Sequence, residues 1–442
     1  MIVKALRSVG INGGADGFVC PGRPKACPTT PVVVACGLLL LAVPFHGVSP
    51  QTALWATPAI LLAAMMIAWA AESAQFFIAQ GFALAVLAWL QTLPEFAVEF
   101  VLAWKQQVPL LLANLTGALR LLTGLGWPMI YFVAAFFHRR NHRKPLRQIQ
   151  LADEHCVEVV GLLVPLLYMM YVWAKGSLDL IDAAVLILMY VAYLLVLGRM
   201  PPQEAEGIEE LERIPRTIVT SRRPVRNALI AGLFVAGGLM IYFTAEPFLG
   251  SLLAISVALG VSPFVFVQWV APLISEFPEK VSAFYWARTV ERAPMALMNM
   301  VSSNINQWTL LAAMLPIVYS ISRGSASSIP FDEQQQLEIL MTLGQSLVAM
   351  IFLINMKLAW WEAAALFGLW GIQFAFSPVK PGPTMAGFIA RHIHWWVTVA
   401  YWAWFSIGLI RCATGARETE AFRLFAAMWR KHIRRVAEPA LK

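Results

Sequence analysis

The sequence predicts an all-α polytopic membrane protein, and three observations support this class. First, 59% of its 442 residues are hydrophobic and only 13% are charged, about half the charged share of an average soluble domain. Second, apolar segments long enough to cross a bilayer recur along the chain. Third, two of these segments share a polar motif. Since soluble cores stop growing at about 250–300 residues, this composition excludes a soluble enzyme, a disordered chain and a disulfide scaffold.

A membrane-spanning helix needs about 20 mostly apolar residues, and twelve segments approach this requirement. They are 31–47, 53–71, 80–104, 109–137, 152–173, 179–198, 227–244, 256–287, 294–321, 335–356, 358–376 and 386–410. The first is an extra amino-terminal helix or, alternatively, a secretory signal, because its apolar run is short and follows basic residues. The last is an extra carboxy-terminal helix.

Positive charge predicts the orientation. The loop after the fourth span, from His138 to Lys144, is rich in Arg and Lys, which are typical of cytoplasmic loops. Alternation of spans then places both termini inside a cell membrane. The expected cytoplasmic parts are the tail 1–30, the linker 199–226 and the basic tail 411–442. The net charge of +8 is spread over short clusters beside spans, so the expected surroundings are a lipid bilayer and not nucleic acid. The oligomeric state has no signal in the sequence.

The shared polar motif indicates an internal duplication. Residues 91–95 read Gln-Thr-Leu-Pro-Glu and residues 275–279 read Ser-Glu-Phe-Pro-Glu. An asparagine follows each glutamate, 19 residues later in the first copy and 20 later in the second. With five helices expected in each unit, 53–198 and 227–376, the two copies must have opposite orientations across the bilayer. Inverted repeats are typical of secondary transporters, whose substrate site lies near the midplane.

The glutamates of the motif, Glu95 and Glu279, indicate a cation site. A charge at the bilayer centre costs about 2.5–3.5 kcal/mol on insertion scales, so each carboxyl group must be protonated, paired or facing a wet cavity. Two carboxylates with amide and hydroxyl oxygens nearby suit Ca²⁺ and balance its charge. Without the ion, mutual repulsion favours protonation, so protons compete for the site. The alternative interpretation is two structural glutamates satisfied by helix packing.

At these residues the chain resembles the cation/calcium antiporter superfamily, the membrane region of sodium/calcium exchangers. Its two inverted five-helix halves each carry a motif close to G-T-S-x-P-E, followed after about twenty residues by G-N-x-x-G-S-N. The resemblance implies a ten-helix exchanger core, Ca²⁺ as transported ion and no cofactor. The implied metal ligands are Gln91, Glu95, Asn114, Ser275, Glu279 and Asn299. Further ion-site positions are Thr92, Glu99, Arg120, Glu276, Ser303, Asn304 and Gln307.

The chain departs from the family pattern at sodium-site positions. Ala118 and Leu119 stand where the family has Ser-Asn, and Glu276 replaces a serine. We hypothesise that Arg120, which follows, is a tethered cation paired with Glu276 or Glu95. Glu99, one turn beyond Glu95, is a candidate extension of the cation path.

The expected function is antiport of Ca²⁺, or a similar divalent cation, against H⁺ or Na⁺ by alternating access. The alternative is an exchanger-fold scaffold or sensor that no longer transports, which the lost ligands favour. The sequence contains no H-E-x-x-H, G-x-S-x-G or P-loop motif, so no enzymatic activity is expected.

Overall fold

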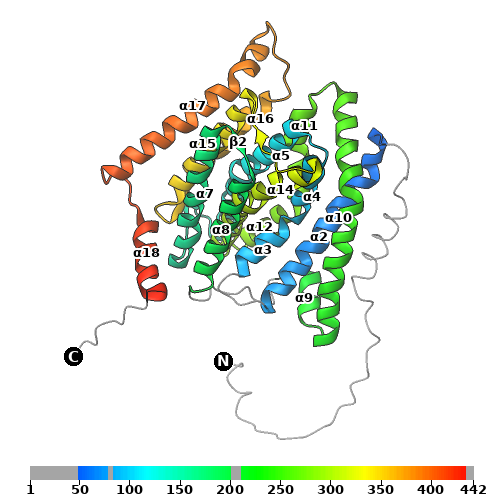
Figure 1. Ribbon diagram of the computed structural model, residues 1–442. Coiled ribbons are helices and arrows are strands. Elements are labelled where there is room, and N and C mark those ends of the chain that lie inside the picture. The colour runs from blue at the N-terminus through cyan, green and yellow to red at the C-terminus, as the bar shows by residue number, and fades with distance from the viewer. Residues whose placement is uncertain (1–47, 78–82, 201–210, 435–442) are drawn as a thin grey trace, which may run out of the picture.

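The computed structural model describes residues 48–77, 83–200 and 211–434, and helices dominate this part of the chain (Figure 1). The predicted all-α class is therefore confirmed. The tail 1–30 and the expected helix 31–47 lie outside the described residues.

Two successive sets of helices form the core. The first set comprises α2 (Ala53–Ala74), α3 (Ala83–Gln91), α4 (Leu93–Trp104), α5 (Val108–Leu121), η4 (Leu122–Gly126), α6 (Trp127–His142), α7 (Cys156–Lys175) and α8 (Leu180–Leu197). The second comprises α10 (Arg223–Leu259), α11 (Pro263–Ser275), α12 (Phe277–Arg288), α13 (Ala293–Asn306), η6 (Gln307–Leu311), α14 (Ala312–Arg323), α15 (Glu333–Leu353) and α16 (Trp360–Phe376). The same elements follow in the same order in both sets.

Corresponding irregularities mark both copies. The expected spans 80–104 and 256–287 are each interrupted, at Thr92 and at Glu276. The start expected at 256 is wrong, because α10 extends to Leu259 and ends at the left-handed Gly260 before α11 begins. The backbone angles at the breaks are almost identical, with φ −86° and ψ −2° at Thr92 and φ −89° and ψ 3° at Glu276. A proline lies two residues beyond each break, and proline removes a helical hydrogen bond and clashes with the preceding turn. One further irregularity is shared, since η4 and η6 are π-helical segments at matching places.

Four short strands show how the copies are related. They are β1 (Gln148–Gln150), β2 (Ser177–Leu178), β3 (Ile329–Pro330) and β4 (Lys357–Ala359). β1 pairs antiparallel with β4, and β2 with β3. β1 and β3 precede the fourth helix of their copies, and β2 and β4 precede the fifth. Each strand before a fourth helix therefore pairs with the strand before the fifth helix of the other copy. This exchange is what a pseudo-twofold axis requires. Strands of two or three residues carry no periodicity, and the sequence did not predict them.

Helix packing follows the same exchange. α5 packs against α11 and α13 against α3, while α4 packs against α14 and α12 against α6. The broken helices of each copy therefore contact the amide-bearing helix of the other. The predicted arrangement of two inverted five-helix repeats is confirmed.

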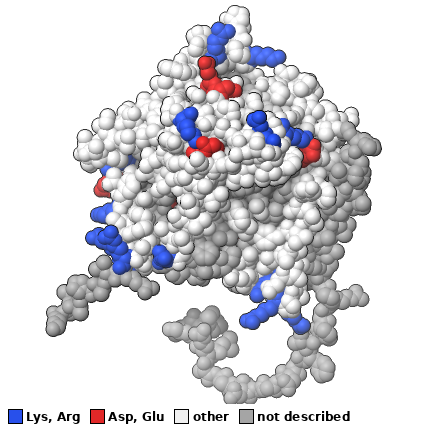
Figure 2. Space-filling view, in the orientation of Figure 1, with Lys and Arg blue, Asp and Glu red and all other residues white. Residues whose placement is uncertain are grey.

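The surface fits a lipid environment. Seven described helices are long and apolar enough to cross a membrane, and the other expected spans within the described ranges consist of shorter helices. Large apolar side chains such as Ile181, Leu188, Val235 and Tyr242 are exposed on α8 and α10. In Figure 2 charged side chains gather toward the ends of the molecule and leave much of the middle uncharged. The chain is a multi-pass membrane protein.

The carboxy-terminal part adds three elements outside the repeats. α17 (Met385–Ala413) is the predicted extra helix and packs against α15. It is followed by α18 (Glu420–Met428) and η7 (Trp429–Ile433). The linker between the repeats contains α9 (Arg213–Val219), which lies with α18 toward the lower end of Figure 1. The described helices of these two expected cytoplasmic segments therefore lie toward the same end of the bundle.

Candidate ion-binding site

The candidate site lies where the broken helices resume. Glu95 and Glu279 are the third residues of α4 and α12. The first turn of a helix carries free N–H groups and a positive partial charge, which favour a carboxylate. Both side chains are 0% exposed, and both accept hydrogen bonds from residues one helical turn apart, Glu95 from Gln307 and Glu279 from Ser303. Neither glutamate faces lipid, and the two belong to one buried cluster.

Gln307, the first residue of η6, joins this cluster across the repeats. Its Nε2 donates to Oε2 of Glu95 at 2.8 Å and to Oε1 of Glu276 at 2.8 Å. Ser303, one turn earlier on α13, donates its hydroxyl to Oε2 of Glu279 at 3.3 Å. Two of the further ion-site positions, Ser303 and Gln307, thus contact a carboxylate or connect two of them.

Three asparagines direct their amide nitrogens toward protein oxygens. Nδ2 of Asn114 donates to Oε1 of Glu99 at 3.2 Å, and Nδ2 of Asn299 donates to Oε1 of Gln91 at 3.1 Å. Nδ2 of Asn306 donates to Oγ1 of Thr92 at 2.6 Å. The carbonyl oxygens of these amides therefore remain for another partner.

Many buried oxygens around the glutamates have no hydrogen-bond partner. They are Oε1 of Glu95, Oε2 of Glu99, Oδ1 of Asn114, Oε1 of Glu279, Oδ1 of Asn299, Oδ1 of Asn304, Oδ1 of Asn306 and Oε1 of Gln307. A buried polar group without a partner costs about 1–3 kcal/mol. Ca²⁺ binds about six to eight oxygens, so a cation would satisfy several of these atoms together. Asn304 also leaves its Nδ2 without a partner.

The acidic residues are not a ready-made metal centre by themselves. Within the described ranges, no three His, Cys, Asp or Glu side chains converge in a metal-binding arrangement. Coordination would therefore rely on amide and backbone oxygens beside the carboxylates. Gln91 and Ser275 are the last residues of α3 and α11, where carbonyls lack intrahelical partners. The hydroxyl of Ser275 donates to the carbonyl of Ala271 at 3.1 Å, and its oxygen keeps its lone pairs.

The predicted partner of Arg120 is wrong. Arg120 is fully buried on α5, but its Nη2 lies 2.6 Å from Oε2 of Glu338 on α15, and no ion pair to Glu276 or Glu95 forms among the described residues. Its Nε donates to the carbonyl of Thr116 at 3.1 Å, and its guanidinium lies over the ring of Trp269 at 5.1 Å. The reason is packing: α15 lies against α5 and presents a carboxylate there.

Glu338 connects Arg120 with other elements. Its Oε2 accepts a hydrogen bond from Nε2 of Gln268 at 3.0 Å, and Nδ1 of His394 on α17 lies 2.6 Å from its Oε1. The extra carboxy-terminal helix is thereby tied to the core.

The sequence did not predict Lys280, Ser282 and Asn306 as residues of the site. Lys280 forms an ion pair with Glu276. The i,i+4 spacing of opposite charges within an apolar span is the sequence feature that could have predicted this pair. Ser282 donates to Oε1 of Glu72, which is only 4% exposed and belongs to the interior.

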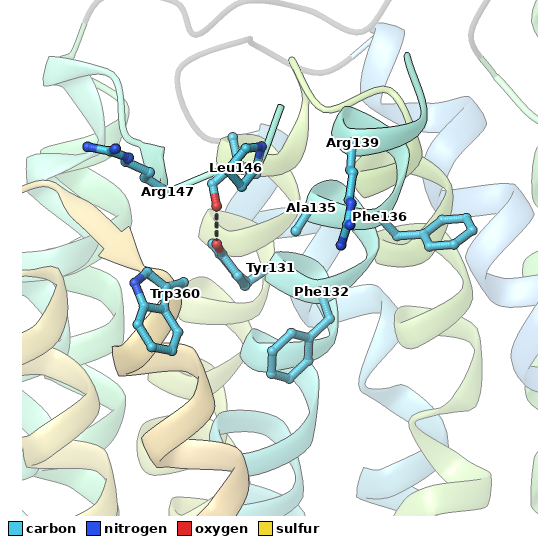
Figure 3. A pocket seen from close by; sticks show the side chains of 9 residues that line it. Tyr131, Phe132, Ala135, Phe136, Arg139, Leu146, Arg147 and Trp360 are labelled. Carbon is cyan, nitrogen blue, oxygen red and sulfur yellow. Dashed lines mark hydrogen bonds between the residues drawn. The ribbon is translucent and has the colours of Figure 1, made fainter. Parts of the chain in front are cut away.

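A separate surface cavity of about 570 Å³ lies away from these carboxylates. Figure 3 shows Tyr131, Phe132 and Trp360 beside Arg139 and Arg147, and the hydroxyl of Tyr131 donates to the carbonyl of Leu146. Aromatic and basic residues together are typical of the membrane interface. None of the predicted ion-site residues lines this cavity.

Inverted repeats whose broken helices meet around buried carboxylates define a secondary-transporter fold. The family model described as "Sodium/calcium exchanger protein" matches residues 49–198 and 229–378, and the chain belongs to this family.

Solved structures agree with this assignment. The structure described as the H⁺/Ca²⁺ exchanger CAX is 30% identical, with a TM-score of 0.78, and the match covers 90% of this chain and 97% of that one. The structure of native YfkE is 14% identical, with a TM-score of 0.54 and coverage of 79% and 98%, which supports the fold alone. No curated protein matches the chain significantly.

Proposed function

We propose that this protein is a secondary active antiporter that moves Ca²⁺, or a similar divalent cation, against H⁺. The observation that carries the proposal is the set of buried, partnerless oxygens around Glu95 and Glu279. Leaving so many acceptors unsatisfied in a membrane protein is costly unless a cation binds there. The similarity to a protein described as an H⁺/Ca²⁺ exchanger supports the same substrate class.

Two carboxylates account for exchange in physical terms. Glu95 and Glu279 together carry the charge that one divalent cation neutralises. When the cation leaves, two neighbouring carboxylates in a low dielectric repel each other, and protons restore neutrality. The bundle then switches between its inward-open and outward-open states only when the site holds Ca²⁺ or protons, because an empty charged site is costly inside the bilayer. No chemical step is part of this mechanism.

H⁺ is favoured over Na⁺ as the counter-ion. The positions of Ala118 and Leu119, where family members have Ser-Asn, offer apolar side chains and no oxygen. The serine position of the second copy is Glu276, which already has a cationic partner in Lys280. The second candidate function is an exchanger-fold scaffold or sensor without transport, and the same missing ligands support it.

We further propose that the residues 1–30, 199–226 and 411–442 are cytoplasmic and that the two exchanger repeats comprise 53–198 and 227–376. The basic loop after α6 and the position of α9 and α18 at one end of the bundle support this orientation. We propose that Gln91, Asn114, Ser275 and Asn299 complete the oxygen set. We propose further ion-site positions at Thr92, Glu99, Ser303, Asn304 and Gln307.

The decisive experiment measures ⁴⁵Ca²⁺ uptake into proteoliposomes with an acidic interior, an interior loaded with Na⁺, or no gradient. We expect uptake only with the proton gradient. Glu279→Gln should abolish it, whereas Glu291→Gln, at an exposed position beyond α12, should leave it unchanged. Uptake that survives Glu279→Gln contradicts the site. No uptake by folded, reconstituted protein under any gradient supports the scaffold instead.

A further inference from the structure

We propose that Lys280 is a resident cation that neutralises Glu276 and thereby excludes Na⁺ from the site. The inference rests on the proposed function, because it specifies which ions the exchanger accepts. Lys280 is the residue after Glu279 on α12 and is 6% exposed. Its ammonium forms an ion pair with Glu276.

The position of Glu276 is defined by the inverted repeat. It stands at the helix break of the second copy, where the first copy has Thr92 with the same backbone angles. Thr92 is neutral and hydrogen-bonded to Asn306. The second copy therefore holds an acid where the first holds a hydroxyl, and a base where the first holds Phe96. Since both breaks face the buried cluster, the added pair of charges lies at the site itself.

Hydrogen bonding separates Glu276 from the other carboxylates. Both of its oxygens have partners, one in Lys280 and the other in Gln307. Glu95, Glu99 and Glu279 each keep one oxygen without a partner. A cation from solution therefore finds free oxygens on three glutamates, while the fourth is already neutralised.

The tether explains why Na⁺ cannot replace the ammonium. A charged group attached to the same helix is present at a high effective concentration, whereas Na⁺ must be drawn from solution. The charge of Lys280 also acts on Glu95 and Glu279. Glu276, Glu95 and Glu279, when ionised, carry three negative charges, and Lys280 cancels one of them. The remaining two charges balance one divalent ion and leave none for an additional Na⁺.

Lys280→Met tests the inference by removing the charge and keeping the apolar stem. Lys105→Met is the matched control, because Lys105 pairs with Glu246 in an exposed ion pair away from the site. The first readout is the thermal unfolding temperature in NaCl and in choline chloride of equal ionic strength. We expect the unfolding temperature of the wild type and of Lys105→Met to be equal in the two salts. That of Lys280→Met should rise in NaCl.

The second readout is competition of Na⁺ with ⁴⁵Ca²⁺ binding. In Lys280→Met, the Na⁺ concentration that halves Ca²⁺ binding should fall about tenfold relative to the wild type. Glu276→Gln/Lys280→Met should lose this sensitivity, because the carboxylate that would bind Na⁺ is gone. If Lys280→Met does not fold, Lys280→Gln serves the same comparison, since it keeps a donor for Glu276.

The outcomes separate this inference from the proposed function. The unfolding measurement requires no Ca²⁺, so it tests Lys280 even if the wild type fails to bind or transport Ca²⁺. A folded Lys280 variant with no response to Na⁺ would overturn the inference. So would a wild type whose Ca²⁺ binding is as sensitive to Na⁺ as that of the variant.

Discussion

The side-chain amide of Gln307 donates a hydrogen bond to the carboxylate of Glu95 at 2.8 Å, and this contact joins the second repeat to the first. The same Nε2 also donates to Glu276. Gln307 begins a π-helical segment, and such segments are frequent at functional sites. One amide therefore orients two acidic side chains from opposite copies.

Gln307→Ala should weaken Ca²⁺ binding by about 10–100-fold, the usual effect of removing a residue that orients metal ligands. Without the shared donor, Glu95 is no longer held toward the other copy. Isothermal titration with CaCl₂ measures the change. Gln334→Ala, at an exposed position on α15, is the control and should bind as the wild type does. Equal affinity in both variants would show that Gln307 does not position Glu95.

Arg120→Leu should lower the free energy of unfolding by about 3–5 kcal/mol, because removing one partner of a buried ion pair leaves the other charge without compensation. The partner left behind is Glu338. Glu338→Leu should have a comparable effect, and the double variant should recover much of the loss. Chemical denaturation in detergent measures all three proteins. Strictly additive effects would mean that the pair is not energetically coupled.

Ca²⁺ affinity should fall as the pH is lowered, because protonated glutamates cannot ligate the ion. If Glu95 and Glu279 both release protons when Ca²⁺ binds, the logarithm of the affinity should rise by up to about two per pH unit. Glu279→Asn should reduce that slope toward one. Equilibrium ⁴⁵Ca²⁺ binding between pH 5 and pH 8 provides the measurement. A wild-type affinity that does not change with pH contradicts proton competition.

Gly117→Ala should destabilise the protein by about 1–3 kcal/mol, the usual range for overpacking. A Cβ at this position would lie only 1.9 Å from the carbonyl oxygen of Gln268, which is backbone and cannot rotate away. Gly117 is thus where α5 and α11 approach each other. Gly232→Ala on α10, with nothing within 4 Å of the added carbon, should be neutral or stabilising because alanine favours helix. The unfolding temperatures of the two variants provide the comparison.

The sequence predicted the two central glutamates of the site, because an acidic residue within an apolar span is rare and costly unless it has a function. The matching Pro-Glu motifs led to Glu95 and Glu279, and both lie in one buried cluster. Resemblance added Ser303 and Gln307, which contact the carboxylates. Asn306 was missed because an amide at the end of an apolar helix is common and its partner, Thr92, lies in the other repeat.

The sequence by itself determined the membrane environment, the duplication and the opposed orientation of the two copies. These follow from hydropathy, charge and the spacing of motifs, which are properties of the linear sequence. Only the tertiary structure decided the partner of Arg120. Arg120 on α5 binds Glu338 on α15, because a Coulomb interaction in a low dielectric depends on separations of a few ångströms. Such separations arise when helices from distant parts of the chain pack together.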